Sequence, residues 1–282
     1  MSRRVKKPGY YPLSEDNEIV TKNSIKLGTS TILVVTYERN RRINLYIGGH
    51  EKWCIHCELI KENDVVKSLG YLIKIRYDML CSLESNFRKG HDINRLIHFL
   101  VTYLSRTYPT VKDLSFNDLS TRTCDNETDM NLAVMTYLYT EHTWYGKNFG
   151  AYISPSSKPQ FTAILTRFAD AKKIPWDDVK ETITHCDTLP YINGELKELY
   201  ERAGTWKEFF APIVERIKIA GFCDFISGWI DAFMLKYFSN LQDLVFLLPV
   251  IEHRLHYEVK EYKEGGRRIT QKSTRKVSRD YH

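Results

Sequence analysis

The sequence predicts an α+β protein, in which a mixed sheet with flanking helices is followed by an all-α C-terminal domain. Three observations lead to this fold class. Apolar and polar residues alternate between residues 31 and 78, as they do in half-buried strands. Residues 92–104 and 130–138 place apolar side chains at helical spacing, with a strand-like pattern between them. Beyond residue 159 the helical spacing continues almost to residue 263.

The first part of the chain predicts an α+β layer. Alternation predicts four strands, at 31–37, 42–47, 52–60 and 70–78. A helix is expected from Asp92 to the proline at 109, a short strand over 112–119, and a second helix from residue 130. Around 142–153 the chain is expected to turn through two glycines into another β-like piece. Together these elements predict a domain over residues 30–153.

The second part of the chain predicts a helical domain over residues 160–263. It follows the proline- and serine-rich segment 154–159, which is typical of a domain boundary. The expected helices are 161–173, 177–185, 194–203, 206–220, 222–238 and 241–263. Thr205 followed by Glu208 predicts a capping box at the start of one of them. An aromatic stripe that includes Phe222 and Phe225 predicts the packing seam of this domain.

The charge of the protein is concentrated at its ends. The chain has 282 residues and a net charge of +6, with 43% hydrophobic and 27% charged residues, which excludes a wholly disordered protein. We expect a polar and basic N-terminal arm at 1–29 and a basic C-terminal tail at 264–282. Such ends could bind nucleic acid, an anionic membrane or an acidic protein, or could serve only as solubilising segments.

Neither a membrane segment nor a metal site is expected. No apolar run reaches the roughly 18 residues of a membrane span, and no apolar segment follows the basic start, so a cytoplasmic protein with reduced thiols is predicted. Cys54 and Cys57 have the spacing of a zinc half-site. They lie in a predicted strand, however, where positions three apart face opposite sides, and no second Cys/His pair follows.

The segment around residues 83–97 offers an anion site. A strand leads through a basic, glycine-bearing turn into a helix, so free backbone N–H groups and a positive dipole end meet there. The expected ligand contacts are Arg88, Lys89, Gly90, His91 and Ile93. The alternative is an ordinary turn, with the aspartate at 92 as a helix N-cap and the basic residues in solvent.

The order of these elements, together with this turn, resembles the acetyl-CoA-dependent N-acetyltransferase (GNAT) superfamily over about residues 30–153. The phosphate loop of that superfamily reads Arg/Gln-x-x-Gly-x-Gly/Ala. With Gly90 as its middle glycine, this chain departs from the motif at Phe87 and at Asp92. The resemblance implies acetyl-CoA as cofactor, with its pyrophosphate on the amides near 88–93. A carboxylate at 92 would repel that phosphate.

A second resemblance lies in residues 143–151, which look like the turn after the fourth helix of those enzymes. It implies that Tyr145 protonates the departing CoA thiolate, because a phenol with pKa near 10 suits a thiolate. Asp78 and His91 are the candidate general bases. The alternative is that Tyr145 and its aromatic neighbours are core residues.

Residues 114–126 and 143–150 also resemble uncharacterised proteins of large cytoplasmic DNA viruses. Two functions follow from these resemblances. One is an active acyl-CoA-dependent N-acetyltransferase. The other is a non-catalytic structural or interaction protein of the host cytoplasm or virion, which binds a protein partner through its helical domain and an anionic partner through its basic ends. The departures in the phosphate loop favour the second, because a transferase must first position its cofactor.

Overall fold

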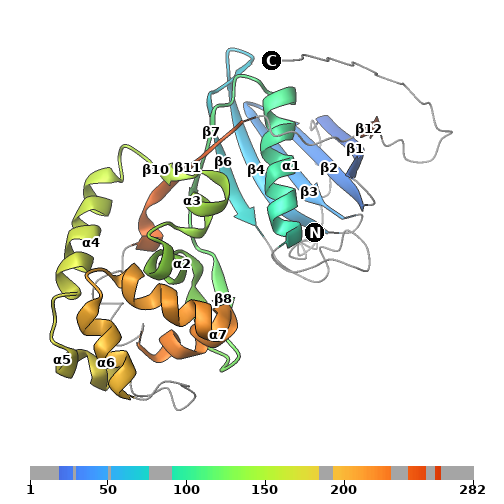
Figure 1. Ribbon diagram of the computed structural model, residues 1–282. Helices are drawn as coiled ribbons and strands as arrows, with labels where there is room; N and C mark the ends of the chain where they lie inside the picture. The colour runs from blue at the N-terminus through green and yellow to red at the C-terminus, as the bar shows by residue number, and fades with distance from the viewer. Residues whose placement is uncertain are drawn as a thin grey trace, which may run out of the picture. The chain divides into compact units, whose positions relative to one another are not determined.

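The chain folds into two compact units in the computed structural model, which describes residues 19–27, 30–49, 52–75, 91–183, 193–229, 241–251 and 258–261 (Figure 1). Unit 1 is built from residues up to 112 and from 250 onwards, and unit 2 comprises residues 113–249. Unit 2 is therefore an insertion in the chain of unit 1. Both units contain helices and strands, so the protein is α+β with a mostly antiparallel sheet.

The boundary expected at 154–159 lies inside unit 2. Its serines are bound to a strand formed almost a hundred residues later: the Ser154 amide donates to the Val245 carbonyl at 2.9 Å, and the Val245 amide donates to Ser157 Oγ at 3.0 Å. Both serines are buried. Residues 154–157 are consequently part of the packed unit rather than a linker, and the two units do not follow the predicted domains 30–153 and 160–263.

Unit 1 is a curved antiparallel sheet. Its strands are β1 (Ile19–Leu27), β2 (Ser30–Arg39), β3 (Arg42–Gly48), β4 (Trp53–Glu62), β5 (Val65–Val66), β6 (Leu69–Ile75) and β12 (Glu258–Glu261). They are ordered β6-β4-β3-β2-β1-β12, with β5 paired to β4. The four strands predicted from alternation form β2, β3, β4 and β6.

Two strands of unit 1, β1 and β12, lie where the sequence predicted an N-terminal arm and a helix. The N-terminal arm predicted over 1–29 contains β1, which pairs along its whole length with β2. Its Ile25 is fully buried, whereas Lys26 is exposed, so β1 has the alternation of a half-buried strand. The C-terminal strand β12 pairs with the outer edge of β1 in a region expected to be helical.

Gly48 permits the close approach of β4 to the end of β3. A Cβ atom at this position would lie 2.5 Å from the Lys52 carbonyl oxygen and 2.6 Å from the Trp53 Cα. The register between the strands shifts at this point, as in a β-bulge. Only glycine fits here without moving backbone atoms.

One face of the sheet packs under helix α1 (His91–Thr107), which runs across it in Figure 1. Tyr103 of α1 hydrogen-bonds to the side chains of Asn23 and Thr36, on β1 and β2. The residues of this face are almost all aliphatic and fully buried: Ile25, Ile32, Val34, Leu45, Ile47, Ile55 and Leu59. The helix predicted from residue 92 therefore forms and covers the core of unit 1.

Unit 2 combines five strands with six helices in its described part. Strands β7 (Asp113–Asn117), β10 (Tyr152–Ile153) and β11 (Val245–Pro249) pair antiparallel in the order β10-β11-β7, and β8 (Thr121–Thr123) forms a hairpin with β9 (Asp129–Asn131). The helices are α2 (Leu132–Thr140), α3 (Trp144–Phe149), α4 (Lys158–Ala171), α5 (Trp176–Ile183), α6 (Asn193–Arg202) and α7 (Trp206–Trp229).

The last predicted helix, 241–263, is wrong, and unit 2 is not all-α. Residues 245–249 form β11, in which Phe246 and Leu248 are buried and alternate with half-buried neighbours. A short apolar run fits a buried strand or a buried helix equally well, and pairing with β7 decides between them. A short 3₁₀ turn, η2 (Leu241–Asp243), precedes this strand.

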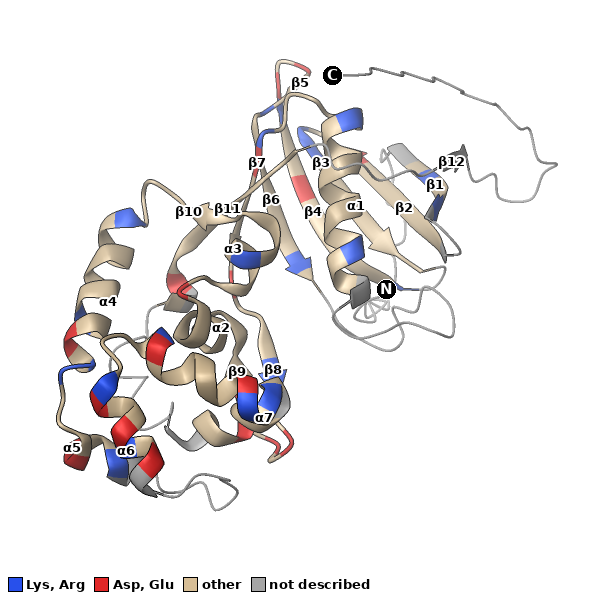
Figure 2. Cartoon of the chain, in the orientation of Figure 1, with Lys and Arg blue, Asp and Glu red and all other residues tan. Residues whose placement is uncertain are grey.

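The core of unit 2 is aromatic. Trp206 stacks on Phe168 and Phe210, and its indole N–H donates to the Phe168 carbonyl at 2.8 Å. Phe222, from the predicted aromatic stripe, is fully buried against Phe210. Lys172 Nζ lies 3.7 Å from the ring centroid of Tyr200, and burial lowers the pKa of this lysine. Acidic and basic residues recur along helices α5 and α6 (Figure 2).

The prediction that the cysteines are reduced thiols is wrong, because the structure contains disulfide bonds. Cys124 is bonded to Cys223, with 5.4 Å between their Cα atoms. Cys54 is also disulfide-bonded. Cys57 is the free cysteine of the described part, and burial raises its thiol pKa. The paired positions are 99 residues apart, so only the fold brings them together.

Candidate functional site

The strongest candidate site in the described chain surrounds Asp118, directly after β7. Its side chain is 1% exposed. The Oδ1 atom accepts hydrogen bonds from the Ser120 hydroxyl and, at 3.3 Å, from the Ser120 amide. The Oδ2 atom is buried and has no hydrogen-bond partner among the described residues. Burial raises the pKa of Asp118 to about 6, although the two Ser120 hydrogen bonds act in the opposite direction.

Tyr145 lies near this carboxyl group, on the short helix α3. Thr143 caps the helix start by accepting a hydrogen bond from the Gly146 amide at 3.1 Å, and Gly150 ends it in the left-handed conformation. The Tyr145 side chain is 6% exposed. Its ring centroid is 4.8 Å from that of Phe116 on β7.

Two effects raise the pKa of Tyr145 above its usual value. Burial is the larger, and the negative charge of Asp118 is the second. The charge of Asp118 therefore disfavours ionisation of the phenol. Near neutral pH the phenol stays protonated, whereas Asp118 lies within the range in which it can gain or lose a proton. Asp118 can therefore hold a proton near neutral pH, whereas the phenol of Tyr145 is a weaker acid than an exposed tyrosine.

The structure places two of the predicted site residues in different units. Tyr145 belongs to unit 2, and Ile93 is buried in the first turn of α1 in unit 1. His91 is the first residue of α1, but its side chain lies outside the described part. Asp78, Arg88, Lys89 and Gly90 also lie outside the described residues.

Asp118 was not predicted from the sequence. The available signal is an aspartate directly after the strand 113–117. Aspartate is common in turns because its side chain hydrogen-bonds to the backbone two residues later, and Asp118 does form this bond with Ser120. What distinguishes Asp118 is its burial, which depends on the rest of unit 2.

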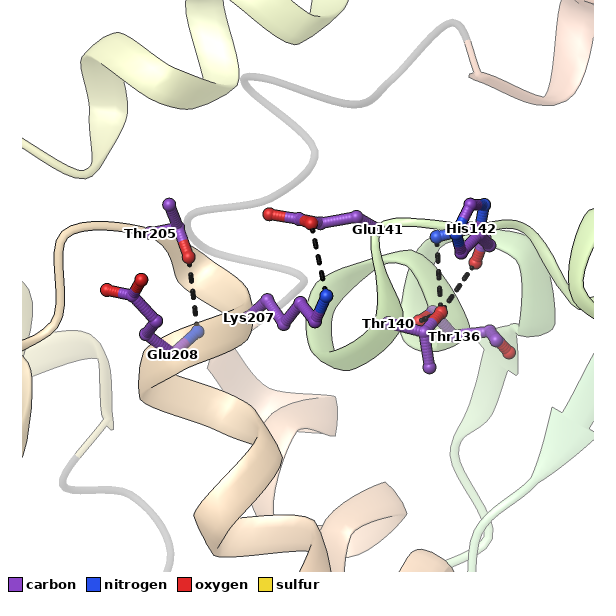
Figure 3. Close-up of polar contacts among 7 residues, drawn as sticks. All are labelled: Thr136, Thr140, Glu141, His142, Thr205, Lys207 and Glu208. Carbon is purple, nitrogen blue, oxygen red and sulfur yellow. Dashed lines mark hydrogen bonds and ion pairs between the residues drawn. The ribbon is translucent and has the colours of Figure 1, made fainter.

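A second polar cluster joins the end of α2 to the start of α7 (Figure 3). Lys207 Nζ lies 3.4 Å from Glu141 Oε2, and both side chains are about half exposed. The Glu208 amide donates to Thr205 Oγ1 at 3.2 Å, which confirms half of the predicted capping box. The Glu208 carboxylate accepts from the Gly204 amide instead of the Thr205 amide. These exposed contacts hold helix ends and offer no enclosed site.

Within the described ranges, no three His, Cys, Asp or Glu side chains gather closely enough to hold a metal ion. None of the helices in those ranges has both the length and the apolar character needed to cross a membrane.

No family model, curated protein or solved structure matches this chain. A functional assignment therefore depends on the chemistry of its own residues.

Proposed function

We propose that this chain is a non-catalytic structural or interaction protein of a large DNA virus, built on an acetyltransferase-like scaffold. It would act in the host cytoplasm or virion, bind a protein partner through the helices of unit 2 and bind an anionic partner through its basic ends. The observation that carries the non-catalytic part is the burial of Tyr145, the residue to which the family resemblance gives the role of general acid.

A general acid must reach the leaving group and must match its pKa. A free thiol has a pKa of about 8.5. Burial and the charge of Asp118 move the pKa of the Tyr145 phenol upward, away from that value. The side chain also has little contact with solvent, because Phe116, Trp144 and Phe149 surround its ring. Both features suit a core tyrosine better than a proton donor.

The cofactor loop supports the same proposal. Phe87 and Asp92 replace residues that the acetyltransferase motif uses for charge and for close backbone approach to phosphate. A carboxylate in place of a glycine or alanine adds negative charge where a pyrophosphate would bind. Without a bound cofactor, this scaffold has no means of acyl transfer.

A protein-binding role is supported by large apolar side chains on the surface of unit 2. Leu119 is 66% exposed and Tyr152 is 46% exposed. Tyrosine is enriched in protein interfaces, because its ring buries a large area while its hydroxyl hydrogen-bonds. In the isolated chain, the Tyr152 hydroxyl donates to Asp113 Oδ1 at 2.9 Å.

The test is thermal unfolding with acetyl-CoA, combined with Tyr145→Phe and the matched surface variant Tyr152→Phe. We expect acetyl-CoA to leave the melting temperature of the wild type unchanged, since a ligand that does not bind cannot stabilise the fold. We expect Tyr145→Phe to unfold near the wild-type temperature, because the ring keeps its contacts with Phe116, Trp144 and Phe149. A concentration-dependent rise with acetyl-CoA would refute the proposal.

The second candidate is an active acyl-CoA-dependent N-acetyltransferase, and one observation favours it. Asp118 and Tyr145 form a pair with separated pKa values, a feature that acid–base sites share. In that case acetyl-CoA stabilises the protein, and Tyr145→Phe lowers turnover by about tenfold or more, whereas Tyr152→Phe does not.

A further inference from the structure

The β8–β9 hairpin of unit 2 is too small to be stable alone. Each of its strands has three residues, and the turn between them spans residues 124–128. The two strands pair in the register Thr121–Asn131 to Thr123–Asp129, and the Cys124 amide donates to the Thr128 carbonyl at 2.9 Å. Isolated two-stranded hairpins are at best marginally stable in water. Contacts with the rest of unit 2 must therefore hold this hairpin in place.

Three contacts join the hairpin turn to the second half of α7. Cys124 is covalently bonded to Cys223. The Asn126 amide donates to Asp224 Oδ1 at 3.0 Å, and Asn126 Nδ2 donates to Ser227 Oγ at 2.7 Å. The α7 residues lie within five positions of each other, so the turn is attached to one short stretch of helix. The disulfide is the one covalent link among these contacts.

That stretch of helix is not a rigid continuation of the first half of α7. Lys218 interrupts the helix with φ 62° and ψ 172°, which is a conformation that residues other than glycine rarely adopt. Residues 219–229 thus form a separate helical segment after a break. The core of unit 2 holds this segment through the fully buried Phe222, and the hairpin turn is attached to the segment.

We propose that the Cys124–Cys223 disulfide is a redox-controlled latch, which holds the hairpin on residues 219–229 when oxidised and releases it when a dithiol reduces it. Cys223 is fully buried and Cys124 is 5% exposed, so a thiolate of the dithiol attacks the Cys124 sulfur during a transient opening of the turn; the Cys124–Cys223 bond breaks and a mixed disulfide with Cys124 forms. The second thiol of the dithiol then displaces the protein sulfur. The dithiol ends as a disulfide, and the two cysteines have gained two electrons and two protons as thiols.

We expect the hairpin to be released because few contacts hold its turn on α7 after the disulfide is reduced. The disulfide is the one covalent link between the hairpin turn and residues 219–229. Without it, the turn keeps two hydrogen bonds from Asn126, one of which is exposed. Exposed hydrogen bonds add little net stability against competition from water. Residues 219–229 stay in the core of unit 2, because Phe222 is fully buried against Phe210, so we expect opening to be confined to the hairpin.

Hydrogen exchange of the full-length protein, with and without dithiothreitol, tests the latch. We expect exchange to accelerate by about tenfold or more on reduction in residues 121–131, whereas residues 219–229 should keep most of their protection. Helix α4, residues 158–171, serves as the internal reference and should keep its protection. Cys124→Ala should exchange rapidly at the hairpin without reductant. Cys57→Ala, which removes a buried thiol outside the latch, should respond to reductant as the wild type does.

Two results would overturn the proposal. One is hairpin exchange that is the same before and after complete reduction, as verified by mass spectrometry. The other is loss of protection in α4 together with the hairpin, which would make the disulfide a general stabiliser of unit 2. Both results come from the wild type, so they remain decisive even where Cys124→Ala fails to fold. The latch is independent of acetyl-CoA binding, so failure of the proposed function leaves it standing.

Discussion

Replacing Asp118 with asparagine is expected to stabilise unit 2 near neutral pH. In the folded protein, burial raises the pKa of Asp118 from 3.8 to about 6, and its Oδ2 atom lacks a partner among the described residues. Ionisation places a negative charge in a buried position where no described cation offsets it, which costs free energy. Asparagine has nearly the same shape and carries no charge at any pH.

The direction and size of the effect follow from proton linkage. The folded protein binds this proton more tightly than the unfolded chain, because the folded pKa is the higher one. The resulting stabilisation is complete below pH 3.8 and is lost as the pH rises through about 6. A difference of about two pKa units corresponds to about 3 kcal/mol of unfolding free energy. The side chain is 1% exposed, so solvent screening takes little from this figure.

The assay is urea unfolding of the wild type and of Asp118→Asn at a series of pH values, from below 3.8 to above the folded pKa of about 6. The difference between the two chains isolates Asp118, because the other titrating groups are common to both. His56, for example, has its pKa lowered to about 4 by burial and contributes equally to each chain. We expect the free-energy advantage of Asp118→Asn to increase by about 3 kcal/mol from the acidic to the neutral end of the range.

Ser120→Ala provides an independent check on the same carboxyl group. The Ser120 hydroxyl donates to Asp118 Oδ1 and lowers its pKa, so removal of the hydroxyl should move the pH window upward. A difference between wild type and Asp118→Asn that stays flat across the range would refute the reasoning. So would a window that moves downward in Ser120→Ala.

Three further perturbations test other parts of the structure. Lys218→Gly should raise the unfolding free energy by about 1 kcal/mol in urea titrations, because glycine adopts φ 62° without strain; equal or lower stability would contradict the proposed break in α7. Gly48→Ala should lower it by about 2 kcal/mol or more, since the added Cβ would lie 2.5 Å from a backbone oxygen, and wild-type stability would contradict the close approach there. Removal of residues 265–282 takes away six basic residues and one acidic residue, or five units of the net charge of +6. Binding to anionic vesicles should weaken and lose most of its salt dependence, whereas unchanged binding would make the tail a solubilising segment.

Predictions based on local patterns succeeded where one face of an element is buried. β2, β3, β4 and β6 were predicted from the alternation of apolar and polar residues, and α1 from apolar residues three and four apart. These patterns are visible in the sequence because the repeat of each element matches the repeat of its buried face. The start of α7 was predicted for a related reason, since the Thr205 cap depends on residues within one turn.

The predictions failed where distant segments decide the structure. Residues 245–249 were expected to be helical and form β11, because β7 offers an edge with which they pair. β1 was hidden in a polar lead-in, where Ile25 is buried but lysines occupy the other face. The candidate site was recognised in part: Tyr145 was named from a family resemblance, whereas Asp118 has the local features of an ordinary turn residue.

The sequence by itself determined the α+β class, most strands and helices, and the basic ends, because periodicity, capping and charge are properties of neighbouring residues. Only the tertiary structure decided that unit 2 is inserted into unit 1, that Cys124 meets Cys223, and that Asp118 is buried beside Tyr145. Burial, disulfide pairing and shifted pKa values depend on which distant segments come into contact. These contacts are set by packing of the whole unit, which no local pattern encodes.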